Sequence, residues 1–285
     1  MQNCSLQTPG KINLYLEIKG KRPDSWHDLL TLFYPVKALS DRVEIRFGGE
    51  GIRIACLFPG VPLNEDNLMA KAAKAFYAAA GVSCPGMEIV LEKNIPAAGG
   101  MGGGSSDAGA VLLLLQKYSG IELSPEKLAQ TALSVGSDVP FFLDPVPSIG
   151  RGRGEILQKV DLPDRLPLLL IPGVFPISAA WAYNHWQDVP RNGEYDLEKL
   201  LQMLASGDHA GAGKLLRNDL QGAAVRKFPL LARLSELLRD SGGAPLMSGS
   251  GSTMFALYPD FAARDRAFEN LKNEISKYDA VLVKI

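Results

Sequence analysis

The feature that most limits what this chain can fold into is a glycine-rich segment between Pro96 and Ala108. Five of the six residues from Gly99 to Gly104 are glycine, and two serines separate them from a long apolar run. Glycine allows positive φ and a close approach of backbone to ligand, and the N–H groups at a helix start attract negative charge. Glycine also costs roughly 0.5–1 kcal/mol relative to alanine in ordered structure. The segment therefore predicts a phosphate-binding turn, with a tight turn of no ligand function as the alternative.

The known nucleotide motifs do not describe this turn. No G-x-x-x-x-G-K-[ST] pattern is present, and no acidic residue stands where the dinucleotide-binding fingerprint needs one. The sequence therefore predicts a different nucleotide-binding fold.

Composition narrows the class of protein. A chain of 285 residues can bury two ordinary cores. Its 30 basic and 31 acidic residues nearly cancel without a basic run, which argues against nucleic-acid binding. The longest apolar runs, Val111 to Leu115 and Leu168 to Ile171, are too short for a membrane span. We expect a soluble protein with a small-molecule substrate and no membrane partner, and the oligomeric state is left open.

The start of the chain and its cysteines predict the compartment. Residues 1–6 lack the basic and apolar parts of a secretory signal, so we expect a cytoplasmic protein. The three cysteines and three histidines show no metal-ligand spacing. Free thiols are expected, and neither a zinc site nor a disulfide framework.

Hydrophobic periodicity predicts the elements of the first half. Alternation indicates strands at Ile12–Ile18, a hairpin of Val43–Phe47 with Ile52–Cys56, and a strand at Met87–Leu91 that leads into the glycine-rich turn. Helices are expected at 66–80, ended by Gly81, after the turn, and from Ser124 and Pro125 to Gly136. Further strand signals stand at Ile149 and at Ile156–Val160.

The second half predicts an α+β arrangement. Strands are expected at Leu168–Ile171, on both sides of Ser248–Ser252 and at Val281–Ile285, and helices at 178–186, 196–204, 225–239 and 261–275. The segment Pro163–Pro167 is the best linker. We therefore expect two domains, residues 1–162 and 163–285.

Three segments together resemble one family. Lys11-Ile12-Asn13-Leu14, the glycine-rich segment, and Met247-Ser248-Gly249-Ser250-Gly251-Ser252-Thr253 are similar to the three motifs of the GHMP kinases. The resemblance implies a two-domain α+β fold, in which a nucleotide-binding domain precedes a ferredoxin-like domain and both ligands bind in the cleft between them. It also implies ATP and magnesium as cofactors.

Shorter matches narrow the resemblance. Trp26-His27, Glu65-Asp66-Asn67-Leu68 and Ser137-Asp138-Val139-Pro140 resemble a branch that phosphorylates a cytidine-diphosphate-linked sugar alcohol. Trp26 stands where that branch usually has tyrosine, and Ala98, Met101 and Ser252 also depart from its pattern. None of these departures removes a charged or hydroxyl group that the chemistry needs.

The resemblance assigns two catalytic residues. Asp138 is the expected base that accepts the proton of the attacking hydroxyl, although an aspartate there also suits a turn cap. Lys11 is expected to pair with Asp138 and to stabilise the developing alkoxide, although a solvated lysine is the ordinary alternative. Asn13 lies on the same strand face and is expected to offer an amide to the substrate or to Asp138.

The remaining roles divide between two ligands. For the nucleotide, the resemblance implies contacts from the loop, its two serines and the adenine side: Asn67, Lys93, Pro96, Gly99, Gly100, Gly102, Gly103, Gly104, Ser105 and Ser106. Helix capping and a solvated strand lysine are the alternatives for Asn67 and Lys93, and Asp107 is either a dipole partner or a group behind the site. For the alcohol substrate, Trp26 and His27 are expected to read the cytosine, Tyr183 to stack on it, and Gly249 to approach its phosphates. The metal ligands stay open.

Two other functions are compatible with the same patterns. One is another GHMP kinase, of the mevalonate or homoserine type, against which Trp26-His27 and Ser137–Pro140 argue. The other is a nucleotide-binding protein without catalysis, which the presence of both Lys11 and Asp138 disfavours.

Overall fold

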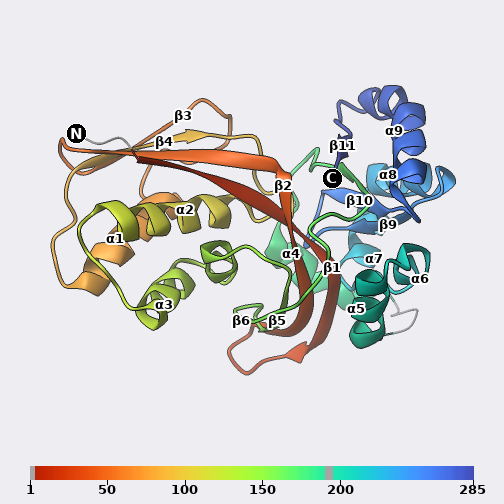
Figure 1. Ribbon diagram of the computed structural model, residues 1–285, viewed down its shortest axis with the longest axis horizontal. Helices are drawn as coiled ribbons and strands as arrows, with labels where there is room; N and C mark the ends of the chain where they lie inside the picture. The colour runs from red at the N-terminus through yellow and green to blue at the C-terminus, as the bar shows by residue number, and fades with distance from the viewer. Residues whose placement is uncertain (1–3, 190–194) are drawn as a thin grey trace. The chain divides into compact units, whose positions relative to one another are not determined.

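The computed structural model describes residues 4–189 and 195–285 (Figure 1). Contacts along the chain group it into two compact units. Unit 1 takes in the chain up to Lys11, Pro35–Ala97 and Gly102–Val146, and unit 2 takes in Ile12–Tyr34, Ala98–Met101 and Pro147–Ile285. The division at residues 162 and 163 follows chain order rather than contacts, and it stays a prediction.

Unit 1 holds a sheet in which β4 (Met87–Glu92) is central. It pairs antiparallel with the second half of β2 (His27–Phe47) and parallel with β3 (Ile52–Cys56). The predicted hairpin of Val43–Phe47 with Ile52–Cys56 is therefore wrong, because β4 lies between the two segments. Side-chain alternation defines the buried face of a strand and not its neighbour, so the sequence pattern alone did not reveal the inserted strand.

The three α-helices of unit 1 match predicted helices, although the first begins at Leu68 rather than at residue 66, and a fourth, 3₁₀ helix was not predicted. They are α1 (Leu68–Ala80), α2 (Gly103–Tyr118), α3 (Pro125–Val135) and the 3₁₀ helix η1 (Val139–Leu143). Asn67 caps α1 by accepting a hydrogen bond from the Met69 N–H, and Ser124 caps α3 in the same way. Buried side chains from α1, α2 and the sheet, among them Phe76, Val111 and Ile89, form one core.

The same seven-stranded sheet, in the order β3-β4-β2-β1-β8, also contains strands of unit 2, which join segments that are distant in sequence. The strand β1 (Cys4–Lys21), which includes the predicted Ile12–Ile18, pairs parallel with β8 (Arg217–Asn218) at Tyr15 and Leu16. The first part of β2 pairs antiparallel with β5 (Ser148–Gly152), which pairs with β6 (Ile156–Lys159).

The second sheet of unit 2 has four antiparallel strands in the order β11-β7-β10-β9. They are β7 (Leu168–Ile171), β9 (Ala244–Met247), β10 (Met254–Leu257) and β11 (Val283–Lys284). With α8 (Pro229–Asp240) after β7 and α9 (Phe261–Ser276) after β10, the chain follows the β-α-β-β-α-β course of a ferredoxin-like fold. The last strand is shorter than the predicted Val281–Ile285.

The helices of unit 2 are α4 (Ala179–His185), η2 (Trp186–Asp188), α5 (Leu197–Ser206), α6 (His209–Gly213), α7 (Gln221–Lys227), α8 (Pro229–Asp240) and α9 (Phe261–Ser276). The single helix predicted over 225–239 is wrong, because helix α7 ends before Phe228 and helix α8 begins after it. Pro229 lacks an N–H and disfavours helical backbone in the residue before it. Within the described ranges, no helix has the length and apolar character that a membrane crossing needs.

Candidate active site

The glycine-rich turn ends at the N-terminus of α2. Gly102 is the N-cap of α2, with φ of 68°, and it makes no side-chain capping bond. Helix α2 is 16 residues long, so its dipole and first N–H groups favour an anion at this end. Such a helix start suits phosphate, and the phosphate site expected from the sequence stays a prediction.

Lys11 and Asp138 lie together beside this helix start. Lys11 Nζ is 3.6 Å from Asp138 Oδ2, and the two side chains are 6% and 31% exposed. A Cβ at Gly102 would lie 3.2 Å from Lys11 Cε, so the lysine passes close to the turn. Although Asp138 precedes η1, its side chain makes no capping hydrogen bond. The carboxylate is thus half-exposed and next to a buried cation.

The side chain of Lys93 is buried, so it is not the solvated strand lysine that was the alternative. Its ammonium group pairs with Asp41 and lies 3.0 Å from Asp107 Oδ2, and all three side chains are at most 4% exposed. Asp41 also accepts hydrogen bonds from the N–H groups of Asn94 and Ile95. This buried cluster therefore joins β2, the end of β4 and the N-terminal part of α2, where Asp107 is the fifth residue.

Asp107 is the unusual member of the cluster. Its Oδ1 has no hydrogen-bond partner. Burial raises the pKa of Asp107 to about 8; Lys93 opposes this rise and Asp41 adds to it. With one cation between two carboxylates, a proton on Asp107 neutralises the cluster.

Two more predicted nucleotide residues serve the fold itself. Asn67 caps α1 and donates from Nδ2 to the Pro62 carbonyl at 2.6 Å. The Ser106 hydroxyl is fully buried between Thr8 Oγ1 and the Pro9 carbonyl. Ser105 is half-buried at the same helix start, as is Pro96 before the loop, whereas Gly104 is exposed.

The tip of the glycine-rich turn belongs to unit 2, where it packs on the turn after β9. The Thr253 N–H donates to the Gly99 carbonyl at 3.0 Å, and the Ser248 hydroxyl donates to the Gly100 carbonyl at 2.9 Å. Gly100 has φ of 80°, and a Cβ there would lie 2.2 Å from the Ser248 carbonyl oxygen. Only glycine fits at this position.

Asn13 is next to the same turn. Its Nδ2 donates to Thr31 Oγ1 at 2.7 Å, and its backbone N–H donates to Ser248 Oγ at 3.3 Å. A Cβ at Gly249 would lie 3.4 Å from Asn13 Oδ1. The structure thus brings Gly100, Asn13 and Gly249 together within unit 2.

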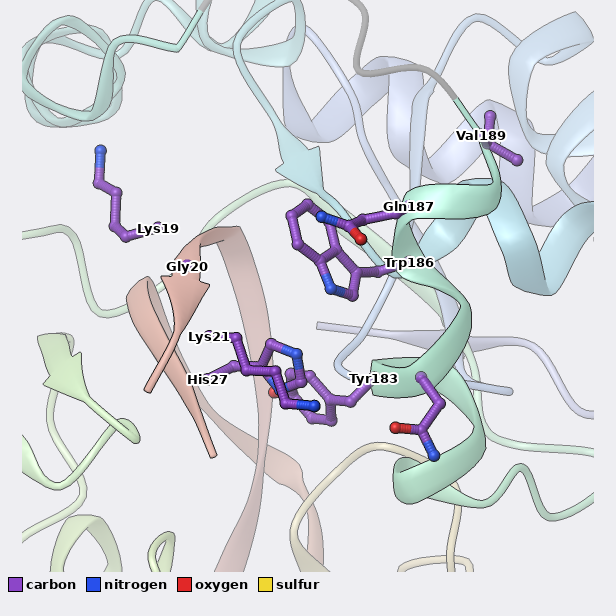
Figure 2. Close-up of a pocket in the computed structure, with 9 residues that line it drawn as sticks. Lys19, Gly20, Lys21, His27, Tyr183, Trp186, Gln187 and Val189 are labelled. Atoms are coloured by element: carbon purple, nitrogen blue, oxygen red, sulfur yellow. The ribbon is translucent and has the colours of Figure 1, made fainter. Parts of the chain in front are cut away.

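A pocket of about 600 Å³ in unit 2 gathers aromatic and basic side chains (Figure 2). The rings of His27 and Tyr183 stack with centroids 5.2 Å apart, and Trp186 stands edge-on to His27 at 6.3 Å. Figure 2 shows Lys21 beside the stacked pair. Burial and, secondarily, the charge of Lys21 lower the pKa of His27. At neutral pH the His27 imidazole is therefore uncharged, with one donor and one acceptor nitrogen.

Trp26 is not among the residues that line this pocket. Its side chain is 53% exposed, and the Arg153 guanidinium lies 5.0 Å from its ring centroid. The stacking role of Trp26 stays a prediction, while Trp186 is an aromatic residue of the pocket that sequence reasoning missed. Its position after the Ser178-capped helix would have been a signal, because Tyr183 lies on the same helix.

The sequence also gave no sign of Asp41. Aspartate inside a strand reads as an exposed residue, and only the contact with the end of β4 shows otherwise.

In the portion of the chain that the structure covers, no three His, Cys, Asp or Glu side chains form a metal-binding group.

Comparisons with known proteins agree on the fold. The sequence matches the family descriptions "GHMP kinases N terminal domain" over residues 67–144 and "GHMP kinases C terminal" over residues 197–277. It is 38% identical to the 4-diphosphocytidyl-2-C-methyl-D-erythritol kinase of Syntrophotalea carbinolica, with 94% of each chain covered. The enzyme of the same name from Geobacter metallireducens is 34% identical, with 96% of this chain and 95% of that one covered.

Solved structures give the same picture. A crystal structure of 4-(cytidine 5′-diphospho)-2C-methyl-D-erythritol kinase matches with a TM-score of 0.80 at 32% identity, covering 99% of this chain and 98% of that one. Homoserine kinase from Cytophaga hutchinsonii matches with a TM-score of 0.75 at 18% identity, covering 100% and 94%, which shows a shared fold alone. The predicted two-domain α+β fold is confirmed.

Proposed function

Since the chain belongs to the GHMP kinase family, and within it to the 4-diphosphocytidyl-2-C-methyl-D-erythritol kinases, we propose that it transfers the γ-phosphoryl group of ATP to the 2-hydroxyl of that cytidine compound. This is the kinase step of non-mevalonate isoprenoid biosynthesis. The distance of 3.6 Å between Lys11 Nζ and Asp138 Oδ2 is the observation that carries the proposal.

The pair suits the chemistry of phosphoryl transfer. The alcohol oxygen attacks the γ-phosphorus, and Asp138 takes the alcohol proton. The bond between the γ-phosphorus and the oxygen that bridges it to the β-phosphate breaks, and ADP leaves. Lys11 attracts the negative charge that develops on the alcohol oxygen. The absence of a capping bond from Asp138 leaves its carboxylate available for this task.

We assign the nucleotide phosphates to the glycine-rich turn and the start of α2. Gly99, Gly100, Gly102, Gly103 and Gly104 supply the close backbone, and the half-buried hydroxyl of Ser105 supports the assignment better than that of Ser106, which is bonded within the protein. Pro96 opens this turn. Asn67 and Lys93 stay assigned to the adenine side, although the polar atoms of both side chains are bonded within the protein. Magnesium, which keeps several waters and takes few protein ligands, would neutralise phosphate charge when bound.

The cytidine end of the substrate is assigned to the aromatic pocket. Tyr183 offers a stacking face, and the neutral imidazole of His27 offers a donor and an acceptor to the cytosine edge. Trp26 is the third residue proposed for the base. Asn13 and Gly249, which adjoin each other, are assigned to the phosphates and hydroxyls of the alcohol.

The proposal also assigns a role to each domain and a cellular compartment to the enzyme. Residues 1–162 carry nucleotide binding and residues 163–285 form the GHMP kinase C-terminal domain. The enzyme works in the cytoplasm on a small molecule, without a nucleic-acid or membrane partner.

Release of ADP tests the proposed reaction. Purified protein with ATP and magnesium should release ADP and form the phosphorylated cytidine compound, with little turnover of mevalonate, homoserine or galactose. Equal turnover of mevalonate would point to another GHMP kinase. ATP binding without turnover of any of these alcohols would point to a nucleotide-binding protein without catalysis.

A further inference from the structure

Two buried polar residues, Ser248 and Asn218, have no assigned part in the reaction, yet they lie where the glycine-rich turn meets Asn13. Ser248 is fully buried. Its hydroxyl donates to the Gly100 carbonyl at 2.9 Å and accepts from the Asn13 N–H at 3.3 Å. One hydroxyl thus joins two backbone segments that are assigned to different substrates.

The backbone of Ser248 is itself held within its turn. The Ser248 N–H donates to the Thr253 carbonyl, and the Ser248 carbonyl accepts from the Gly251 N–H, both at 2.9 Å. The same turn donates from the Thr253 N–H to the Gly99 carbonyl. These bonds fix the backbone that carries the Ser248 hydroxyl.

Asn218, at the end of β8, holds this turn from the other side. Its Nδ2 donates to the carbonyls of Met247 and Gly249, at 2.7 Å each, and its Oδ1 accepts from the Leu220 N–H at 2.9 Å. The two carbonyls belong to the residues on either side of Ser248. An amide satisfies both, whereas a carboxylate would direct an oxygen at two carbonyl oxygens.

We propose that Ser248 and Asn218 are positioning residues of the phosphoryl transfer. Ser248 sets the backbone of Gly100 relative to that of Asn13, and Asn218 sets the turn that carries Ser248. The inference rests on the proposed function, which gives Gly100 to the nucleotide and Asn13 to the alcohol. Phosphoryl transfer depends on positioning more than on covalent chemistry, so small shifts here should lower kcat.

Ser248→Ala, compared with Ser252→Ala, tests the inference. Ser252 lies in the same turn and is 1% exposed, but its hydroxyl bonds only to the backbone of Phe175, at 2.5 and 3.2 Å, among the contacts described. We expect kcat to fall about 10-fold or more in Ser248→Ala, with smaller changes in both KM values, and to stay within about twofold in Ser252→Ala. Equal kcat values in the two variants, or a fall in kcat that follows the melting temperature in both, would overturn the inference.

Asn218→Asp is a second test of the inference, and it keeps the inference testable if Ser248→Ala does not fold. It should lower kcat in the same way, and the Asn218→Asp/Ser248→Ala double variant should lose less than the product of the single effects, because both act on one turn. Independent, multiplicative effects would contradict a shared role.

Calorimetry with ATP and magnesium separates this inference from the proposed function. If the wild-type protein binds ATP but does not phosphorylate the cytidine compound, the proposed reaction fails. In that case, weaker ATP binding by Ser248→Ala than by Ser252→Ala would still support positioning of the turn, and equal binding would refute it.

Discussion

At the scale of single residues, Asp138 pairs with the buried Lys11. A substitution of Asp138 therefore distinguishes a catalytic role of its carboxylate from a structural one. Asp138→Asn keeps the shape of the side chain and removes the proton acceptor. We expect kcat to fall about 10²–10⁴-fold, with ATP affinity and melting temperature near those of the wild type. Asp144→Asn, at the exposed far end of η1, is the control for loss of a carboxylate. A near-normal kcat in Asp138→Asn would assign this residue to the turn alone.

At the scale of elements, the start of α2 depends on close packing over the buried cluster of Asp41, Lys93 and Asp107. A Cβ at Gly103 would lie 2.8 Å from Lys93 Nζ and 3.0 Å from Ile95 Cγ2. Gly103→Ala should therefore destabilise the protein by roughly 1–3 kcal/mol and weaken ATP binding, which thermal melting and calorimetry measure. Gly104→Ala is the matched variant for stability, because its Cβ would meet only Leu68 Cδ1, at 3.6 Å. An unchanged melting temperature and ATP affinity in Gly103→Ala would remove the packing argument.

Local signals in the sequence predicted the elements well where the chain's own neighbours decide the structure. Asn67 and Gly81 bound α1, and Ser124 and Pro125 open α3 as expected. One error was local, because Pro229 divides the helix predicted over 225–239, and the other errors concern partners far along the chain. The two-residue strand β8 has no pattern of its own, and its pairing with β1 spans about 200 residues. For the site, the motif resemblance led to Lys11 and Asp138, whereas Asp41 and Asn218 become visible only through contacts that folding creates.

At the scale of the whole molecule, the proton on Asp107 couples stability to pH. The pKa of this carboxyl is raised to about 8 in the folded state, from an ordinary value of 3.8. The folded protein then binds more protons than the unfolded chain between these values, so its stability falls as pH rises through that range. Asp107→Asn keeps the neutral form at every pH. Its melting temperature relative to the wild type should therefore rise from pH 6 to pH 8.5, and a constant difference would refute the protonated carboxyl.

The interleaved course of the chain has a consequence for how the protein is made. Tyr15 and Leu16 leave the ribosome about 200 residues before their strand partners, Arg217 and Asn218. At about 5–20 residues per second, that edge of β1 waits roughly 10–40 s before its partner exists. Apolar side chains of the same strand, Leu16 and Ile18, complete a core whose other members lie beyond residue 168, apart from Leu29. During synthesis these apolar side chains lack most of their core partners for that time, so shielding of this strand should limit its aggregation.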